Sequence, residues 1–391
     1  MNAPLSKKLN EVKWGEFKIG DLFEIQKISN ILSKEDLSDD YSYPAYSSDS
    51  ENNGIIGYTN NPEFICDEKH PVYITFGDHT RTLNIARKSF SVLDNVKVLL
   101  PCTNKNNSLL FMILVWKKQI PNLGYARHWK VAKNCILSLP ITPENKIDFD
   151  FMEAFIRELE EERIRELTAY LKVSGFDNYK LSKCESEALA HFNELKWKEF
   201  NLINVFDVKN THNILSNEIK KDSGSVPYLC ASSVNNGVSS YISYKEELVE
   251  KGNCIFIGGK TFVVSYQEKD FFSNDSHNLA LYVKDLQPTK LNQLYLATCV
   301  YKGLNHKYTW GDSISGTKIK SDRIMLPIAS GDSPDYAFME TFISAVQKLV
   351  IKDVVLYADK KIAATKQAVH KNPSDYKTSD GFGALKVAEH N

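Results

Sequence analysis

An internal duplication is the feature of this chain that most constrains its fold. Lys-Trp-Gly-Glu-Phe at 13–17 returns as Lys-Trp-Lys-Glu-Phe at 196–200, an offset of 183 residues. Phe-Met-Glu-Ala-Phe-Ile at 151–156 returns as Phe-Met-Glu-Thr-Phe-Ile at 338–343, an offset of 187. Solenoid repeats have periods of about 20–50 residues, so a period this long indicates a duplicated domain. We expect two similar folds with two similar binding surfaces, related by pseudo-two-fold symmetry.

The composition is that of a soluble globular protein. The chain has 391 residues, of which 42% are hydrophobic and 25% charged, and this length predicts roughly two to three domains. Because the net charge is only −1, DNA binding has to rest on local basic patches. Residues 1–12 lack the apolar centre of a signal peptide, and the longest apolar run, 109–116, is too short to cross a bilayer. We therefore expect a cytoplasmic protein with no membrane segment.

The seven cysteines are scattered, and none forms a Cys-x-x-Cys pair. A zinc site of the usual spacing is therefore not expected, and the pattern favours buried free thiols in a reducing compartment.

Each half reads as a strand-rich domain followed by a long helix, which predicts a mixed α+β fold. Short β-branched or aromatic runs separated by turn signals predict strands at 43–46, 72–76, 90–92 and 96–100, and at 226–229, 254–257, 262–266 and 279–283. Shorter helices are expected at 109–118 and 291–301. The expected organisation is a first domain at 1–147, a helix and connector at 148–192, a second domain at 193–334, a second helix at 335–371 and a loosely ordered tail at 372–391.

The two long helices are predicted by apolar residues at steps of three and four. Asp148 is a candidate N-cap of the first helix, and Gly175 is expected to end it. At 1.5 Å per residue the helices would be roughly 38 and 54 Å long. The simplest arrangement is an antiparallel coiled-coil spacer. The stripe residues expected to make helix or subunit contacts are Met152, Phe155, Ile156, Leu159, Leu167, Phe338, Phe342, Val346, Leu349 and Leu356.

The common catalytic motifs are missing from the sequence. There is no Walker-type loop, no Rossmann glycine motif, no His-Glu-x-x-His and no Gly-x-Ser-x-Gly. The acidic cluster at 158–162 lies on a predicted helix, where a solvated or partner-facing surface explains it better than paired catalytic carboxylates. We therefore assign no catalytic residue, no metal ligand and no cofactor.

A basic segment interleaved with aromatic residues occurs in each half and is a candidate DNA contact. Lys and Arg neutralise phosphates, and neighbouring polar and aromatic groups position them. The first segment supplies Lys117, Lys118, Tyr125, Arg127, His128, Trp129, Lys130 and Lys133. The second supplies Lys302, Lys307, Tyr308, Trp310, Lys318 and Lys320, and is diluted by Asp312 and Asp322.

A polar turn after the central strand of each half is a second candidate. The first turn contains Asp78, His79, Thr80 and Arg81, and the second contains Lys260 and Thr261. Such groups can read base edges in the major groove, although a solvated polar turn explains them equally well. The turns differ while the framework around them repeats, which is what reading two different half-sequences requires. Trp14, Phe17, Trp197 and Phe200 are expected to close the domain cores.

With these motifs the chain resembles the specificity (S) subunit of type I restriction-modification systems and the related type IIB subunit of the BcgI kind. The resemblance rests on Lys13-Trp14-x-Glu16-Phe17 and its copy, on Thr-Phe-Gly-Asp-His-Thr-Arg at 75–81, and on Gly-Tyr-Ala-Arg-His-Trp-Lys at 124–130. The order domain–helix–domain–helix, through about residue 371, is its most specific part. The second half departs from the pattern with Tyr308-Thr309-Trp310-Gly311.

The resemblance implies that each globular domain is a target recognition domain reading one half of a split double-stranded DNA site. It implies that the helices form a spacer that docks two methyltransferase subunits, that a restriction subunit completes the complex, and that this chain does no catalysis itself. Two other functions stay open on the residues alone. One is a tandem binding module for a glycan or peptide with a helical dimerisation stalk, and the other is a nuclease or methyltransferase with a degenerate site.

Overall fold

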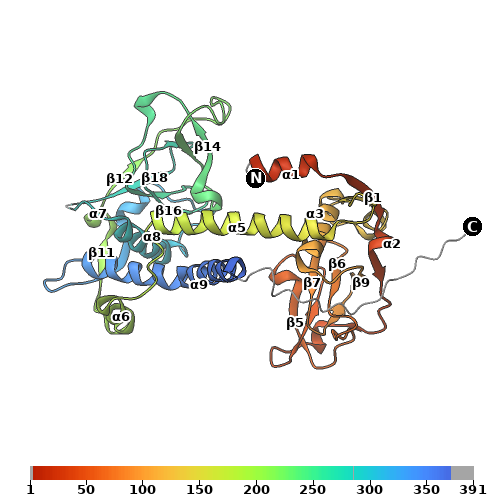
Figure 1. Cartoon of the computed structure of the whole chain (residues 1–391). Helices are drawn as coiled ribbons and strands as arrows, with labels where there is room; N and C mark the ends of the chain where they lie inside the picture. Colours follow the sequence, from red (N-terminus) through yellow and green to blue (C-terminus); the bar gives the residue numbers. More distant parts are fainter. Residues whose placement is uncertain (1–2, 285, 371–391) are drawn as a thin grey trace, which may run out of the picture. The chain divides into compact units, whose positions relative to one another are not determined.

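The computed structural model describes residues 3–284 and 286–370 of the chain (Figure 1). The contacts of the chain divide it into two compact units, and each is described by itself. Unit 1 comprises Met1–Ala169 and Lys360–Asn391, and unit 2 comprises Tyr170–Asp359. The tail expected at 372–391 lies outside the described residues.

Unit 1 is built around two four-stranded sheets and a two-stranded ribbon. The first sheet, in the order β2-β9-β6-β7, is antiparallel, and the second, in the order β3-β8-β4-β5, contains parallel pairs at β8. β1 and β10 form the ribbon. The strands are β1 Trp14–Lys18, β2 Phe23–Ile25, β3 Ile31–Leu32, β4 Tyr43–Tyr46, β5 Ile55–Thr59, β6 Tyr73–Gly77, β7 Thr82–Ala86, β8 Ser91–Leu93, β9 Val96–Pro101 and β10 Ile136–Pro140.

Unit 2 repeats this plan with a smaller second sheet. Its sheets have the orders β12-β18-β15-β16 and β14-β13-β17, and β11 pairs with β19 as the ribbon. Trp14 pairs with Pro140 in the first ribbon, and Trp197 pairs with Pro327 in the second. The strands are β11 Trp197–Asn201, β12 Phe206–Asn210, β13 Val226–Leu229, β14 Val238–Ile242, β15 Cys254–Ile257, β16 Val264–Gln267, β17 Phe272–Ser273, β18 Leu279–Val283 and β19 Arg323–Pro327.

Nine α-helices occur in the described residues. The short ones are α1 Ala3–Glu11, α2 Ile19–Leu22, α4 Trp129–Ala132, α6 Lys183–Ala190 and α7 Leu202–Val205. α3 Asn106–Gln119 and α8 Lys290–Leu304 each pack against the main sheet of their unit, and α5 Phe149–Val173 and α9 Tyr336–His370 are the long helices. Short 3-10 turns span Lys34–Asp36, Asn52–Gly54, Phe192–Glu194, Val234–Gly237, Glu246–Leu248 and Lys318–Ser321.

The central strand of each main sheet is buried on both faces. In β6, Ile74 and Phe76 face α3, where Phe76 stacks on Trp116 at 5.8 Å between ring centroids. Tyr73, which alternates with them along the strand, belongs to a separate core cluster on the other face. β15 is likewise buried along its whole length. A continuous apolar run is the pattern expected of a strand covered on two sides, and it places the turn that follows each strand at the rim of the core.

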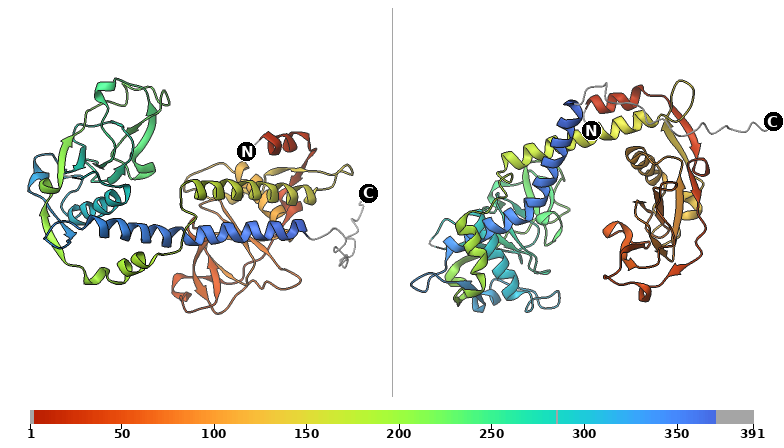
Figure 2. Two further views of the ribbon diagram at one scale, coloured as in Figure 1. Left: turned by 60° about the vertical axis from the view of Figure 1, so that its left-hand side comes forward. Right: turned by 60° about the horizontal axis from the view of Figure 1, so that its bottom comes forward.

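The two long helices begin and end as their sequence predicts. The Asp148 carboxylate accepts the backbone N–H of Phe151 at 2.8 Å, and Asp335 caps α9 in the same way through Phe338 at 2.9 Å. Gly175 has a φ of +73°, and Phe176 N–H donates to the Leu171 carbonyl, which closes α5 with a left-handed residue. Both views of Figure 2 show α5 and α9 as uninterrupted helices.

Most of the apolar stripe residues of these helices are buried in, or pack against, the core of the unit to which the helix is attached. Met152, Phe155 and Ile156 are buried in the core of unit 1, with Leu159 against them, and Phe338 and Phe342 pack against the core of unit 2. Leu167 and Val346 are half-buried. Leu349 and Leu356 are exposed, as are their neighbours Val350, Val354 and Tyr357. Within unit 1, Lys361 of α9 donates a hydrogen bond to Glu160 of α5 at 2.5 Å.

A short helix precedes each ribbon and is tied to the long helix of its unit by a charged pair. In unit 1, Lys8 of α1 forms an exposed ion pair with Glu158 of α5. In unit 2 the signs are reversed: Glu185 of α6 is buried and binds Lys348 of α9 at 2.8 Å and Ser344 at 2.6 Å. Neither short helix was predicted from the sequence.

Three expectations need correction. The strand expected from 262 begins at Val264, because Phe262 is the closing residue of a turn with a φ of +50°. Phe17 and Phe200 pack against the cores, but Trp14 and Trp197 remain 39% and 37% exposed, because residues three apart in a strand point to opposite faces. All seven cysteines are free thiols, yet only Cys254 is buried, and Cys102 and Cys184 are exposed.

Candidate DNA interface

The turn between β6 and β7 in unit 1 has a fixed, left-handed closure. Arg81 has a φ of +58°, and its N–H donates to the Gly77 carbonyl at 2.9 Å. A Cβ at Gly77 would overlap the hydroxyls of Thr80 and Thr82 and approach the backbone of Ser48. Glycine is therefore required where the strand enters the turn.

Asp78 connects this turn to the basic segment through hydrogen bonds made in the interior of unit 1. Asp78 and His128 are both buried. The Asp78 carboxylate accepts the Trp129 N–H at 2.6 Å, at the start of α4, and the Asp78 carbonyl accepts the His128 N–H and Nδ1–H, each at 2.9 Å. Because Nδ1 donates, Nε2 is free to accept the N–H of Leu123 at 3.0 Å. These contacts fold the loop 121–128 over the turn.

The other side chains of the turn are half-buried and hydrogen-bonded within unit 1. His79 Nδ1 lies 3.1 Å from the Tyr125 carbonyl, Arg81 Nη1 donates to the Ile120 carbonyl at 2.7 Å, and the hydroxyl of Thr80 contacts that of Thr82. The structure therefore brings together the two segments that the sequence singled out separately. The Tyr125 side chain, at the tip of the loop, is 98% exposed.

The cations of the first segment lie in this loop or directly beside it in the sequence. Lys117, Lys118, Arg127, Lys130 and Lys133 are exposed, and none forms an ion pair with another described residue. Trp129 differs from its neighbours, because it is half-buried and packs on Phe76 with a centroid distance of 5.3 Å. Unit 1 thus presents five positive charges without an ion-pair partner among the described residues, in the same segment as the exposed ring of Tyr125.

Unit 2 repeats the turn with other side chains. Phe262 takes the place of Arg81, with a φ of +50° and an N–H that donates to the Gly258 carbonyl at 2.8 Å. Gly259 takes the place of Asp78, and a Cβ there would overlap the carbonyl of His277. The N–H of Gly259 donates instead to the side chain of Asn278 at 3.0 Å. The backbone turn is conserved between the units, and the groups that it carries are not.

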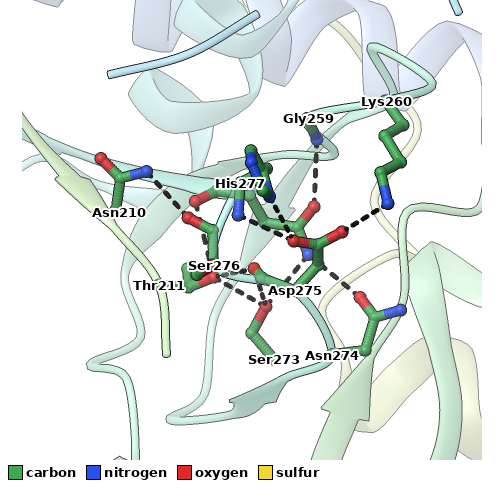
Figure 3. Close-up of polar contacts among 10 residues, drawn as sticks. Asn210, Thr211, Gly259, Lys260, Ser273, Asn274, Asp275, Ser276 and His277 are labelled. Carbon is green, nitrogen blue, oxygen red and sulfur yellow. Dashed lines mark hydrogen bonds and ion pairs between the residues drawn. The ribbon is translucent and has the colours of Figure 1, made fainter. Parts of the chain in front are cut away.

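Lys260 of this turn is held by an acidic residue from another loop (Figure 3). Its Nζ lies 3.1 Å from Asp275 Oδ2, and Asp275 Oδ1 accepts the backbone N–H and the Nδ1–H of His277 at 2.9 and 2.8 Å. Burial alone would raise the pKa of Asp275, but the hydrogen bonds from His277 and the charge of Lys260 hold this pKa below its usual value. Asp275 therefore carries its negative charge at neutral pH.

The loop that presents Asp275 and His277 is braced by polar groups beneath it. The Thr211 hydroxyl contacts the Ser273 hydroxyl and the Asp275 carbonyl, each at 2.8 Å, and Asn210 donates to the Ser276 carbonyl at 2.8 Å (Figure 3). Thr261 anchors the turn itself by donating to the Ala231 carbonyl at 2.9 Å. Lys260 and His277 thus occupy a prearranged polar surface.

The second basic segment meets its turn through aromatic rings. Phe262 lies 5.5 Å from Tyr308, between centroids, and Tyr308 is buried. Burial, and then the hydrogen bond to Asp322 at 2.5 Å, raise the pKa of the Tyr308 hydroxyl. Lys307 pairs with the same buried Asp322, and Lys318 pairs with Asp312.

The remaining residues of the second segment are open to solvent. Lys302 and Lys320 are exposed and form no ion pair with the described residues, and Trp310 is 77% exposed. Asp275 and His277 were not singled out from the sequence. The polar run at 273–278 is longer than the Asp94-Asn95 turn before β9 in the first half, and this difference is the signal that could have identified them.

The described residues contain no group of three or more His, Cys, Asp or Glu side chains arranged to hold a metal ion. None of the helices in residues 3–284 and 286–370 is long and apolar enough to cross a membrane.

Comparison with known proteins identifies the class to which these paired domains belong. The family model of the type I restriction modification DNA specificity domain matches the chain twice, over residues 11–169 and 194–356. The chain belongs to this family, and the resemblance seen in the sequence is confirmed. It is a specificity subunit of a restriction-modification system, and its two matches coincide with the two copies of the duplication.

Two relatives extend this result over most of the chain. A protein of Heyndrickxia coagulans described as "Type II restriction enzyme BgcI specificity subunit S.BcgI" is 22% identical over 357 residues, which is 88% of this chain and 97% of that protein. The crystal structure of the type I restriction-modification system S subunit from M. genitalium matches with a TM-score of 0.56 at 13% identity, covering 92% of this chain and 94% of that one. The structural match shows that the fold is shared. The expected mixed α+β fold, with two similar domains each followed by a long helix, is confirmed.

Proposed function

We propose that each unit reads one part of a bipartite, asymmetric double-stranded DNA site through the surface around its left-handed turn. The observation that carries this proposal is that one backbone turn recurs in both units with different side chains. A shared scaffold places the reading groups at the same point, and divergence at that point allows two different half-sequences to be read.

Fewer side chains are assigned to contacts with DNA than the sequence predicted. Asp78, His128 and Tyr308 are buried, and Trp129 packs on Phe76, so we assign these four side chains to positioning the loops. Tyr125 and Arg127 in unit 1, and Lys260 and Trp310 in unit 2, are exposed and are assigned to base or sugar contacts. Lys117, Lys118, Lys130, Lys133, Lys302 and Lys320 are assigned to phosphates. His79, Thr80, Arg81, Thr261, Lys307 and Lys318 support them, through the contacts described above.

The partners in this proposal are two methyltransferase subunits and a restriction subunit, and the site of action is the cytoplasm. The long helices act as the spacer between the reading units, paired antiparallel as a coiled coil. Leu349, Val350 and Leu356 support a docking role for α9, because they are exposed apolar side chains on a helix whose other face packs on unit 2. A methyltransferase that is a separate subunit and one that is fused to a nuclease fit this surface equally well.

Electrophoretic mobility shifts test whether DNA binding is shared between this chain and its methyltransferase. The isolated chain is expected to bind duplex DNA weakly and with steep salt dependence, and more tightly once its methyltransferase is bound. A Val350→Asp variant should retain the weak binding but lose the gain. Equal affinity of the isolated chain and the complex at the same salt concentration would contradict the proposal.

A further inference from the structure

The loop that joins β17 to β18 in unit 2 is longer than its counterpart in unit 1. Five residues, 274–278, form this loop, whereas two residues, 94 and 95, join β8 to β9. Both connections contact the left-handed turn, since the N–H of Asp78 donates to the Asn95 carbonyl at 2.8 Å and that of Gly259 donates to Asn278 at 3.0 Å. The additional residues of unit 2 therefore lie where the fold already holds a loop against the turn.

Buried hydrogen bonds fix the path of this longer loop. Asn278 is 1% exposed, and its side chain donates to the Ser273 hydroxyl at 3.0 Å and to Asn274 at 3.1 Å. A Cβ at Gly259 would overlap the His277 carbonyl, so the loop and the turn are in direct contact. Buried polar groups that are hydrogen-bonded in this way make a loop rigid, and its exposed side chains are presented in one arrangement.

His277 is the exposed side chain at the end of this arrangement (Figure 3). Its side chain is 66% exposed, and its Nδ1 lies 2.8 Å from Asp275 Oδ1. Because an ionised carboxylate only accepts hydrogen bonds, Nδ1 carries the proton and Nε2 of the neutral imidazole is an acceptor. This Nε2 forms no hydrogen bond with the described residues. His277 thus offers a free acceptor to whatever contacts unit 2 here.

Lys260 completes the arrangement from the turn. Its ammonium group pairs with the other carboxylate oxygen of Asp275, Oδ2, at 3.1 Å, so the negative charge is balanced without a second proton on His277. Asp275 itself is only 22% exposed, and both of its oxygens are engaged. One carboxylate therefore holds a hydrogen-bond donor of the turn and a hydrogen-bond acceptor of the loop next to each other.

A fixed acceptor discriminates among the base edges of the major groove. The donors presented there are the 6-amino group of adenine and the 4-amino group of cytosine, whereas guanine and thymine present acceptors. Nε2 of His277 would pair with either amino group. Opposite guanine or thymine it would face an oxygen or nitrogen lone pair, which leaves two acceptors unpaired.

We propose that His277, held by Asp275, reads the exocyclic amino group of one adenine or cytosine in the part of the DNA site that unit 2 contacts. Nε2 of His277 makes the base contact, and Asp275 is a positioning residue that fixes which ring nitrogen carries the proton. The inference rests on the proposed function, and it adds to the turn a reading residue from the longer loop.

Mapping of methylated positions in cells that express the chain with its methyltransferase locates the base. His277→Ala should change one adenine or cytosine to any base, within the part of the motif that Trp310→Ala also relaxes. Ser276→Ala should give the wild-type motif, because this exposed neighbour has a hydroxyl that forms no hydrogen bond with the described residues. A bipartite wild-type motif that His277→Ala leaves intact would refute the inference but not the proposed function. A continuous motif would overturn both.

Base analogues test the hydrogen bond itself. Purine in place of the adenine, or 2-pyrimidinone in place of the cytosine, removes the amino group from a duplex that carries the mapped motif. The wild-type chain in complex with its methyltransferase should bind the analogue duplex about fivefold more weakly than the natural one, which is the effect of one ordinary hydrogen bond. The His277→Ala complex should bind the two duplexes equally. The same loss in this variant would mean that another residue reads the amino group, and the inference would fail.

Two substitutions of Asp275 separate positioning from folding. Asp275→Asn keeps an oxygen for the backbone N–H and the Nδ1–H of His277, so it should keep the base preference. Asp275→Ala frees the ring to change its tautomer and should relax the same position as His277→Ala does. Thermal unfolding of each variant reports whether it is folded. A folded Asp275→Ala variant with the full base preference would overturn the positioning role.

Discussion

Unit 1 and unit 2 both place a turn next to a basic segment. They differ in whether the basic side chains form ion pairs. In unit 1, Lys117, Lys118, Arg127, Lys130 and Lys133 form no ion pair with the described residues. In unit 2, three of the basic side chains are engaged by acids: Lys260 by Asp275, Lys307 by Asp322 and Lys318 by Asp312.

This difference suits the two copies of one scaffold to two kinds of contact with DNA. Uncompensated cations attract phosphates at a distance and release counterions on binding, so unit 1 is suited to supply most of the electrostatic affinity. Cations that are already paired contribute less attraction, but their side chains lose less freedom on binding, which favours selectivity. The comparison predicts an anchoring unit and a discriminating unit within one chain.

The largest expected effect is on the salt dependence of DNA binding. Replacing the four phosphate-contacting lysines of unit 1, Lys117, Lys118, Lys130 and Lys133, with alanine should lower the magnitude of the slope of log K against log salt by roughly 3 to 4, at about 0.9 per phosphate contact. Replacing Lys302, Lys318 and Lys320 in unit 2 should lower it by roughly 2, because Lys318 is already paired. Lys307 stays unchanged in this variant because it covers the buried Asp322. Equal slopes for the two variants would remove the distinction between the units.

A smaller effect is expected where the turn meets the segment. His128→Ala should reduce the free energy of unfolding by about 2–4 kcal/mol, because the buried hydrogen bond to the Asp78 carbonyl and the partly buried one from the Leu123 N–H are both lost. His79→Ala, on the same turn but half-exposed, should cost less than about 1 kcal/mol. Denaturant unfolding of both variants measures the difference. Similar losses would show that His128 does not hold the loop.

Much of this architecture was readable from the sequence, because it rests on local patterns. The apolar stripe and the residues Asp148 and Gly175 predicted α5 within one residue at each end, and continuous apolar runs located β13 and β15. The ribbons were not predicted as strands, although their sequences were recognised as repeats. Trp14 pairs with Pro140 across more than a hundred residues, and the exposed faces of the ribbon carry no strong alternation of polar and apolar residues.

The sequence predicted the segments that form the candidate DNA interface, but it did not predict which of their residues contact one another. The sequence identified both the turn at 77–81 and the segment at 117–133, yet it could not show that Asp78 and His128 meet in the interior. Such pairings depend on tertiary packing between residues distant in the chain, as do Lys260 with Asp275 and Lys307 with Asp322. Polar residue type alone therefore overestimated how many of these side chains face solvent.

The smallest effects concern the short helices, where the two units again differ. Glu185→Gln should destabilise unit 2 by about 2–3 kcal/mol, because it leaves Lys348 without its buried partner. Lys8→Met removes an exposed pair in unit 1 and should cost less than about 1 kcal/mol. Thermal unfolding of the two variants measures this contrast. Equal shifts in Tm would mean that burial does not distinguish the two pairs.

The same pair predicts a pH dependence. Burial alone would raise the pKa of Glu185, but hydrogen bonds from Lys348, Ser182 and Ser344 lower it to about 2. A lowered pKa in the folded state stabilises the protein above the unfolded value of about 4.3, and this stabilisation is lost as the pH falls toward 2. In Glu185→Gln this part of the acid sensitivity should be missing. An unchanged acid-unfolding profile would argue against the assignment.

Each unit is proposed to read its own part of one DNA site. Mapping of methylated positions in DNA from cells that express the chain with its methyltransferase tests this most directly. The wild-type protein should give a bipartite, asymmetric motif. Tyr125→Ala and Arg127→Ala should relax bases in one part only, and Lys260→Ala and Trp310→Ala should relax bases in the other part only. A continuous palindrome, or a single variant that relaxes both parts, would contradict the account.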